Sequence, residues 1–361
     1  MRKESLEFLK ELVNTPSPTS RELEGQRVWM RYVRAYAEET FSDAYGNCVA
    51  IFNKGGSPRV MLAAHADEIA MTVCYIDEKG FLYVRRMGGV QPRNILAQRV
   101  WIHTRHGRVL GVIGTVPPHL LRAEPEKEKK LPEWGEIFID IGATSREEAA
   151  KQVEIGDPVT LVDEFQLLNE QVATARAFDN RIGTFAVAET LRLLRESGKK
   201  PEAEVCAVSN VMEEVGLYGA RQIAYSLKPD VAVVIDVTHA TDYPGVKMTL
   251  HGEVKLGKGP TVTRGGSSHI EVVRRLEEVA KQEGIPLQIE APSTTSGTDT
   301  DAIFWTRGGI PTGLVSLPNR YMHSPVEVIH LGDLEQIPRL LAAFVLSLKK
   351  EDRFAVRISE E

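Results

Sequence analysis

The sequence VMLAAHADE, residues 60–68, places an apolar run directly before three ionisable side chains. Five consecutive apolar residues that follow the turn-forming stretch NKGGSP, residues 53–58, are typical of a buried strand. In open α/β sheets, ligands bind beyond the carboxyl ends of the strands. His65, Asp67 and Glu68 therefore stand where a functional site is expected.

Ionisable residues also follow the other strands that the sequence predicts. Strands are expected at 204–211, 231–235 and 312–316, and the residues after them are Glu213 and Glu214, Asp236, and His323. Asp179 stands just before a helix that is expected from 180 to 197. Because carboxyl ends of strands in one sheet meet at one edge, these side chains are candidates for a single site.

Strand and helix patterns alternate on both sides of a region that shows strands alone. From about residue 70 to 162, short β-rich runs are separated by glycine turns, which is typical of a small all-β domain. A chain of 361 residues also exceeds the size of one hydrophobic core. We therefore predict a discontinuous α/β domain, residues 1–68 and 166–361, interrupted by an inserted β-rich domain, residues 69–165.

The N-terminal region predicts helices rather than a targeting segment. Residues 1–14 alternate charged and apolar side chains and lack the apolar core of a signal peptide. Helical periodicity covers residues 5–13 and 22–39, and Thr19 and Glu22 form a capping box that would open the second helix.

Composition limits the partners and the compartment. Lys and Arg number 44 against 50 Asp and Glu, and the resulting net charge of −6 gives no general attraction for nucleic acid. No segment approaches the ~18 uninterrupted apolar residues that cross a bilayer, so no membrane partner is expected. The three cysteines are far apart and odd in number, which favours a reducing compartment. We expect a cytoplasmic protein.

The ionisable set indicates a metal centre only when its members are taken together. Singly, Asp179 is explained as a helix N-cap, and His65 or His323 as a hydrogen-bonded structural histidine. Together, imidazoles and carboxylates form the ligand mixture that suits Zn²⁺, Co²⁺ or Mn²⁺, and clustered carboxylates need cations or shared protons. Two histidines and three carboxylates exceed the three protein ligands of a typical mononuclear catalytic zinc. Two ions bridged by Asp179 are therefore expected.

The neighbouring glutamates, Glu213 and Glu214, are expected to have different roles. Side chains alternate in direction along an extended segment, so neighbours are unsuited to binding the same ion. One binds metal, and the other remains a base that takes a proton from the hydrolytic water. Asp67 is expected behind the ligands, where it accepts a hydrogen bond from the free ring nitrogen of His65.

Five motifs in order make the chain similar to a known family. They are HADEI (65–69), AFDNR (177–181), VMEEVG (211–216), VIDVT (234–238) and YMHSP (321–325). Jointly they resemble the dinuclear glutamyl aminopeptidases, a family that includes the tetrahedral TET aminopeptidases and some members labelled endoglucanase. The resemblance implies a mixed-sheet, phosphorylase/hydrolase-like catalytic domain, and an inserted β-rich domain used in assembly, often into dodecamers.

The resemblance also implies a role for each site residue. His65 and Asp236 would be terminal ligands of one ion, Glu214 and His323 of the other, with Asp179 as the bridge and Glu213 as the general base. Two departures stand out: Ala70 replaces the usual glycine after the first motif, and the segment SGTDTD, residues 296–301, is unusually acidic for the family's substrate loop. The sequence predicts neither an acidic nor a basic side-chain preference.

The predicted function is that of a metal-dependent aminopeptidase that removes N-terminal residues from short peptides. Two divalent ions, zinc or cobalt with manganese as an alternative, and Glu213 would activate the water, and the chain would form a homo-oligomer. His239 is a candidate oxyanion stabiliser, with a structural role as its alternative.

Three other functions are alternatives to a metal-dependent aminopeptidase. A glycosidase also uses paired carboxylates but needs no histidine–carboxylate metal site. A nucleotide site at Gly252–Lys258 is disfavoured because Gly259 and Pro260 follow, in place of a hydroxyl residue and a helix. A non-enzymatic scaffold would retain a vestigial site, although every expected ligand and the base are present.

Overall fold

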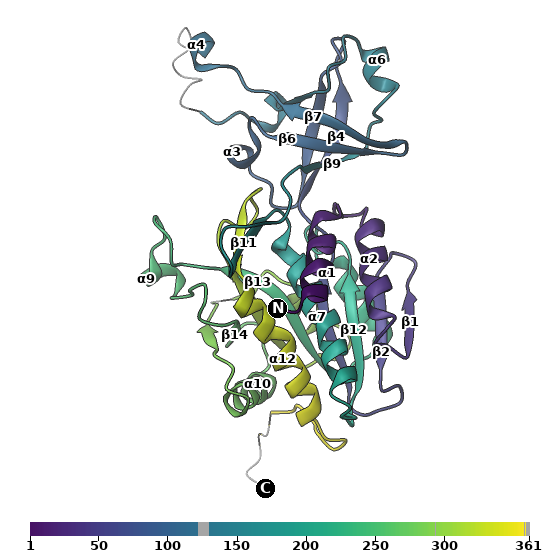
Figure 1. Cartoon of the computed structure of the whole chain (residues 1–361), viewed down its shortest axis with the longest axis vertical. Helices are drawn as coiled ribbons and strands as arrows, with labels where there is room; N and C mark the ends of the chain where they lie inside the picture. The colour runs from purple at the N-terminus through teal and green to yellow at the C-terminus, as the bar shows by residue number, and fades with distance from the viewer. Residues whose placement is uncertain (122–129, 293, 357, 359–361) are drawn as a thin grey trace.

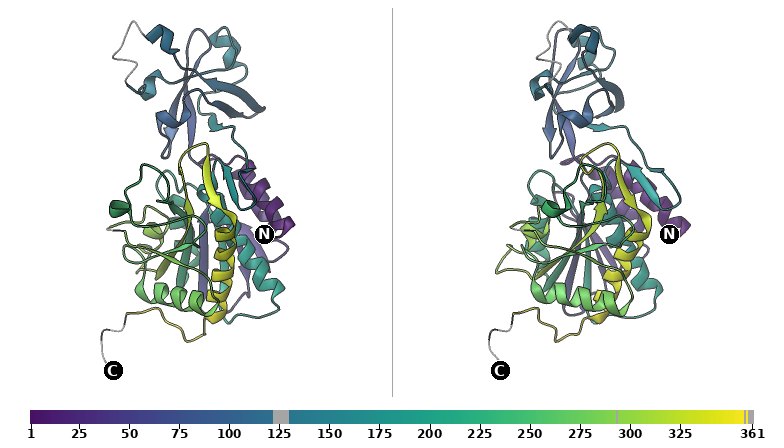
Figure 2. Two further views of the ribbon diagram at one scale, coloured as in Figure 1. Left: turned by 60° about the vertical axis from the view of Figure 1, so that its left-hand side comes forward. Right: turned by 90° about the vertical axis from the view of Figure 1, so that its left-hand side faces the viewer.

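The computed structural model describes residues 1–121, 130–292, 294–356 and 358. A β-barrel projects from one end of a larger α/β domain, at the top of Figure 1, and both views in Figure 2 show the same arrangement. The predicted fold class, an α/β domain with a small additional β domain, is confirmed. Residues 122–129 of the expected insertion lie outside the described residues.

The α/β domain is built on an eight-stranded mixed sheet. Its order is β1-β2-β12-β3-β13-β16-β14-β15, and the four central strands β12, β3, β13 and β16 are parallel to one another. The strand bounds are β1 Glu39–Ser42, β2 Cys48–Phe52, β3 Arg59–His65, β12 Glu204–Asn210, β13 Val231–His239, β14 Thr261–Thr263, β15 Gln288–Glu290 and β16 Thr312–Asn319. Because helices cover both faces of such strands, their sequences are almost continuously apolar.

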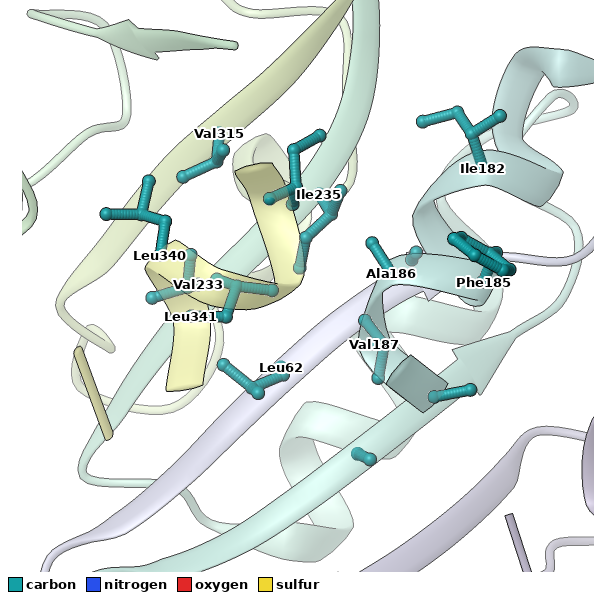
Figure 3. Close-up of a cluster of buried hydrophobic side chains, with 14 of the residues drawn as sticks. Leu62, Ile182, Phe185, Ala186, Val187, Val233, Ile235, Val315, Leu340 and Leu341 are labelled. Carbon is teal, nitrogen blue, oxygen red and sulfur yellow. The ribbon is translucent and has the colours of Figure 1, made fainter. Parts of the chain in front are cut away.

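Two hydrophobic cores cover the two faces of this sheet. Alternate residues of each strand enter opposite cores, as Leu62 and Val233 enter one while Met61 and Val234 enter the other. Figure 3 shows the first core, where Leu62 and its neighbours lie between the sheet, α7 and α12. Its helices are α1 (Lys3–Asn14), α2 (Leu23–Val33), α7 (Phe178–Glu196), α10 (Ile270–Gln282) and α12 (Leu331–Ser347), and those of the other core are α8 (Tyr218–Leu227) and α11 (Thr300–Ile303).

The inserted segment folds into a closed antiparallel barrel with its own core. The strand order is β4-β5-β8-β7-β6-β9, and aliphatic side chains such as Leu82, Ile102 and Ile139 fill the interior. The bounds are β4 Ala70–Ile76, β5 Leu82–Met87, β6 Arg99–Thr104, β7 Gly107–Ile113, β8 Phe138–Asp140 and β9 Pro158–Leu161. Short helical segments connect these strands: α3 Pro92–Ile95, α4 Pro118–Leu121, η1 Trp134–Glu136 and α6 Arg146–Ala150.

A buried ion cluster lies where the chain passes between the barrel and the α/β domain. Glu68, two residues before β4, contacts Arg176 at 3.1 Å and Arg181 at 2.9 Å. Arg181 is fully buried and also donates to the backbone carbonyls of Leu12 and Thr15 in and after α1. The remaining elements beside this junction are a small sheet of β10 (Gln166–Leu167), β11 (Val172–Ala175) and β17 (Glu327–His330), and α9 (Met248–His251) lies farther along the chain.

Two expectations for the N-terminal region were wrong. The helix expected to run to Glu39 ends at Val33, because Glu39–Ser42 pairs antiparallel with β2 instead, and this tertiary pairing overrides local helical periodicity. The capping box does not form: the side-chain oxygen of Thr19 has no hydrogen-bond partner, and the carboxylate of Glu22 accepts from the backbone of Ser20 and Met212.

Candidate metal centre

The carboxyl ends of the four central strands open into one cavity of about 550 Å³. Strand alternation aims the side chains: His65 ends β3 in register with Asn210 of β12, and Asp236 lies in β13 among residues buried on both faces. The cavity contains all but one of the site residues expected from the sequence, namely His65, Asp179, Glu213, Glu214, Asp236, His239 and His323. The exception, Asp67, is fully buried beside it.

Asp179 lies between the two histidines. Its Oδ1 is 3.2 Å from Nε2 of His65, and its Oδ2 is 3.1 Å from Nε2 of His323. Each histidine also faces a second carboxylate: Asp236 Oδ1 is 3.8 Å from Nε2 of His65, and Glu214 Oε1 is 3.5 Å from Nε2 of His323. The structure therefore shows two histidine–carboxylate groups that share one aspartate.

Glu213 belongs to the same half of the cavity as His65. Its Oε2 lies 3.8 Å from Nε2 of that histidine, and the potential ligand atoms of His65, Glu213 and Asp236 lie within 4.8 Å of one another. Asp179, Glu214 and His323 form a second group by the same measure. Both groups have the nitrogen and oxygen donors that divalent transition metals bind.

The carboxylates of this cavity are too crowded to be negatively charged without compensation. Burial raises the pKa of Glu213, Glu214 and Asp236, and neighbouring carboxylates raise them further. Asp179 differs, because hydrogen bonds from His323 and His65 outweigh its burial and lower its pKa. Asp179 is therefore the carboxylate whose ionised form the two histidines favour.

The two histidines respond to the same crowding. Burial alone would lower the pKa of His323, but its contacts with Asp179 and Glu214 raise the pKa to about 11. The pKa of His65 is also raised, since Glu213 and Asp179 outweigh its burial. Oε1 of Glu214 is buried and accepts no hydrogen bond from the described residues. Crowded carboxylates and an unsatisfied oxygen fit bound cations.

Two buried carboxylates position the backbone of the site. Asp67 accepts the N–H groups of Glu213 and Glu214 at 3.0 and 3.1 Å. Glu327, at the start of β17, accepts the N–H groups of Asp179 and His323, both at 3.0 Å. The sequence interpretation missed Glu327, although its place four residues after His323 was a signal.

The expected contact between Asp67 and His65 has a different geometry. Nδ1 of His65 is 3.1 Å from the backbone carbonyl oxygen of Asp67 and 3.4 Å from its carboxylate. The nearer atom is the carbonyl, while the carboxylate is engaged by the backbone that carries Glu213. Asp67 therefore contacts both a histidine and the glutamate loop.

The backbone around the site is strained at several non-glycine residues. Left-handed φ angles occur at Ala177, Met212, Leu217, Tyr321 and His323, each next to or within a motif that carries a site residue. Non-glycine residues adopt this region at an energetic cost of about 1–3 kcal/mol each, and such residues cluster at functional sites. The left-handed turns in these segments therefore place the site residues in the cavity despite their energetic cost.

The barrel also contributes to the cavity wall. Gly89, between β5 and α3, packs so closely that an added Cβ would lie 2.2 Å from Nδ1 of His323. Asn94 of α3 donates to the carbonyl oxygen of His323 at 3.1 Å. Adjacent glycines, here Gly88 and Gly89, indicate a close approach of the backbone to another group. The sequence interpretation did not predict this contact from them.

A mixed α/β sheet whose strand ends deliver histidines and carboxylates to one cavity defines the class, an α/β protein with a candidate hydrolytic metal centre. Residues 46–340 match the M42 glutamyl aminopeptidase family. Since that match spans most of the chain, this chain belongs to the M42 glutamyl aminopeptidases, which are peptide hydrolases.

Comparisons with individual proteins support the assignment. The chain is 36% identical to a lysyl aminopeptidase of Pyrococcus furiosus, over 96% of this chain and 98% of the relative. The Pyrococcus horikoshii TET1 peptidase, which can assemble into a tetrahedron or a large octahedral shell, is 33% identical, with a TM-score of 0.84 over 95% and 100% of the chains. An endoglucanase of Thermotoga maritima is 28% identical, with a TM-score of 0.75 over 93% and 96%. The resemblance expected from the five motifs is confirmed.

Among the described residues, no helix is both long and apolar enough to cross a membrane.

Proposed function

We propose that the chain is a metal-dependent aminopeptidase that holds two divalent ions. The observation that carries the proposal is Asp179, which presents one carboxylate oxygen to each of two histidines that also face a carboxylate of their own. His65 and Asp236 would hold one ion, Glu214 and His323 the other, with Asp179 shared. The donor set favours zinc or cobalt, with manganese as an alternative.

When bound, such cations lower the pKa of a water molecule and polarise a peptide carbonyl. Glu213 is the proposed general base. Its carboxylate borders the cavity, and Asp179 already supplies an oxygen near each histidine, so neither proposed ligand group requires Glu213. Burial raises its pKa, which suits a group that must accept a proton and then pass it to the leaving amine.

His239 is the proposed hydrogen-bond donor to the developing oxyanion. It ends β13 and lines the cavity. Although His239 is an exposed residue, desolvation lowers the pKa of its imidazole. A neutral imidazole still donates one N–H.

We also propose that the chain forms a homo-oligomer, with a dodecamer as the expected assembly, through the domain at residues 69–165, and that it acts in the cytoplasm. The TET1 peptidase of Pyrococcus horikoshii can assemble into a tetrahedron or a large octahedral shell. The barrel here exposes large apolar side chains, including Tyr75, Leu110 and Val112. Exposed apolar side chains favour protein contacts. Sedimentation velocity measures the assembly directly.

Metal removal and restoration test the proposed function. The protein is stripped with EDTA, loaded with Zn²⁺, Co²⁺ or Mn²⁺, and incubated with a short peptide and its N-acetylated form. Mass spectrometry should show stepwise loss of N-terminal residues from the free peptide alone, and only after metal is restored. Equal activity before and after stripping, or cleavage of the acetylated peptide, would contradict the proposal.

The glycosidase alternative has a direct test in the same samples. The neighbour from Thermotoga maritima is named an endoglucanase. Release of reducing sugar from carboxymethyl cellulose by the stripped protein would favour the alternative, because carboxylate-based glycosidases need no metal.

A further inference from the structure

A second cavity adjoins the cavity of the candidate metal centre. It has a volume of about 510 Å³ and shares Val237, Thr238, Ser296 and Thr298 with the first cavity. Asp236 and Thr238 lie two residues apart in β13, so they point to the same side of the sheet, roughly 7 Å apart along the strand. A substrate held at the centre can therefore extend a side chain into this second cavity, named here the side pocket.

The side pocket combines apolar walls with one carboxylate. Val254 and Leu314 are buried wall residues, and Glu290, the last residue of β15, also lines the pocket. The two oxygens of Glu290 accept hydrogen bonds from the hydroxyl groups of Thr238 and Thr261, the latter at 2.5 Å. These bonds fix the orientation of the carboxylate.

The charge of Glu290 lacks a cationic partner in the part of the chain that the structure describes. Arg264, whose backbone N–H bonds the carbonyl of Glu290, directs its side chain to Glu277 at 2.7 Å. Lys255 is likewise paired with Glu253. A carboxylate has about four lone-pair sites, so two remain after the threonine bonds.

The other ionisable side chain of the side pocket is His251, which is exposed. An imidazole, unlike lysine or arginine, is not a permanent cation. It therefore does not replace the missing partner of Glu290.

We propose that the side pocket receives the side chain of the N-terminal residue of the substrate and that Glu290 selects a basic residue, lysine or arginine. This proposal rests on the proposed aminopeptidase function. The methylene stem of a basic side chain packs against Val254 and Leu314, and its cationic head completes the partners of Glu290. An acidic side chain would be repelled by the same carboxylate.

A pair of matched substrates tests this selection. Lysyl and norleucyl p-nitroanilides have the same four-carbon side chain, and norleucine lacks the terminal ammonium group. The variants are Glu290→Gln, which removes the charge, and Glu283→Gln as a control, because Glu283 is exposed and forms no ion pair among the described residues. The wild-type protein should prefer the lysyl substrate. Glu290→Gln should lower its kcat/KM on that substrate about 10- to 100-fold and leave the norleucyl value within about threefold.

Two outcomes would overturn the proposal. Wild-type protein that hydrolyses norleucyl substrate as well as lysyl substrate shows no basic preference. Equal losses on both substrates would mean that Glu290 holds the α-amino group or supports the fold.

A binding measurement separates this proposal from the proposed function. Calorimetry with free lysine and free norleucine needs no turnover. Tighter lysine binding that Glu290→Gln weakens about tenfold or more supports the side pocket, even if neither substrate is hydrolysed and the aminopeptidase proposal fails. Lysine binding no tighter than norleucine binding, or unchanged in the variant, would overturn the pocket assignment while leaving the metal-dependent activity intact.

Discussion

The strand ends of the central sheet and the interior of the barrel bury different kinds of side chain. The barrel interior is aliphatic, with Leu82, Ile102 and Ile139 packed together. The cavity at the strand ends instead buries Glu213 and Asp236, whose pKa values burial raises. Buried carboxylates destabilise a fold unless cations or hydrogen bonds compensate them. The interior of the barrel is therefore stabilised by its own packing, whereas the buried carboxylates of the cavity depend on nearby positive charge or hydrogen bonds.

The barrel and the cavity nevertheless contact each other, notably at one glycine. Gly89, which follows β5 of the barrel, contacts the ring of His323 in the cavity. Four variants distinguish the contributions of the two domains. They lie in the cavity, at the contact between the domains, in the residues that hold the proposed ligands in place, and in the barrel.

The largest effect is expected inside the cavity. Glu213→Gln should lower kcat by about 10²- to 10⁴-fold because the proton acceptor is lost. The bound metal, measured by elemental analysis, should remain at the wild-type level, since Glu213 is not a proposed ligand. Normal turnover, or loss of an ion, would show that the base is elsewhere or that Glu213 is itself a ligand.

A smaller effect is expected at the contact between the domains. Gly89→Ala places a Cβ against His323, so the ring must move and activity should fall about 10- to 100-fold with weaker metal binding. Gly135→Ala is the control, because Gly135 has open space around its Cβ position. Equal activity of the two variants, measured with saturating metal, would show that the barrel does not constrain the site.

A still smaller effect is expected at Glu327, which holds the backbone of two proposed ligands. Glu327→Gln replaces one of two acceptor oxygens with a donor, so it cannot accept both the Asp179 and His323 N–H groups. Metal affinity, measured by competition with a chelator, should fall about tenfold. Addition of excess metal should restore most of the activity, and failure to do so would point to a wider loss of structure.

The smallest effect is expected in the barrel and concerns stability alone. Burial lowers the pKa of His103 to about 4, and its Nε2 lies 2.8 Å from the hydroxyl of Thr160. Because the unfolded chain binds this proton more readily, the contribution of His103 to stability is fully present above about pH 6.5 and is lost as pH falls to about 4, by roughly 3 kcal/mol. Thermal unfolding of His103→Gln between pH 7 and 4.5 should therefore depend less on pH than that of the wild type. Identical pH dependence would contradict the assignment.

The strand ends were predictable because one local pattern, an apolar run followed by ionisable residues, recurs along the chain. His65 and Asp236 could be placed from that pattern and the general geometry of α/β sheets. Glu327 and Gly89 could not, since they act on the backbone or by the absence of a side chain, and only long-range folding brings them to the cavity.

The limits of local pattern also explain the errors in the fold. The helical periodicity that covers residues 22–39 reaches Glu39, yet the pairing of Glu39–Ser42 with β2 makes that segment an edge strand. The barrel, by contrast, was visible as alternating short strands separated by glycine turns, because each of its strands pairs antiparallel with its neighbours. Sequence periodicity thus identified elements that pair with segments close to them in the chain. It failed where tertiary pairing, rather than local pattern, determines whether a segment is helix or strand.

Zinc-edge anomalous diffraction from crystals grown with zinc examines the dinuclear site most directly. Two peaks are expected in the cavity, one in contact with His65 and Asp236, the other with Glu214 and His323, and both with Asp179. A single peak, or peaks that none of these side chains contact, would contradict the two-ion assignment.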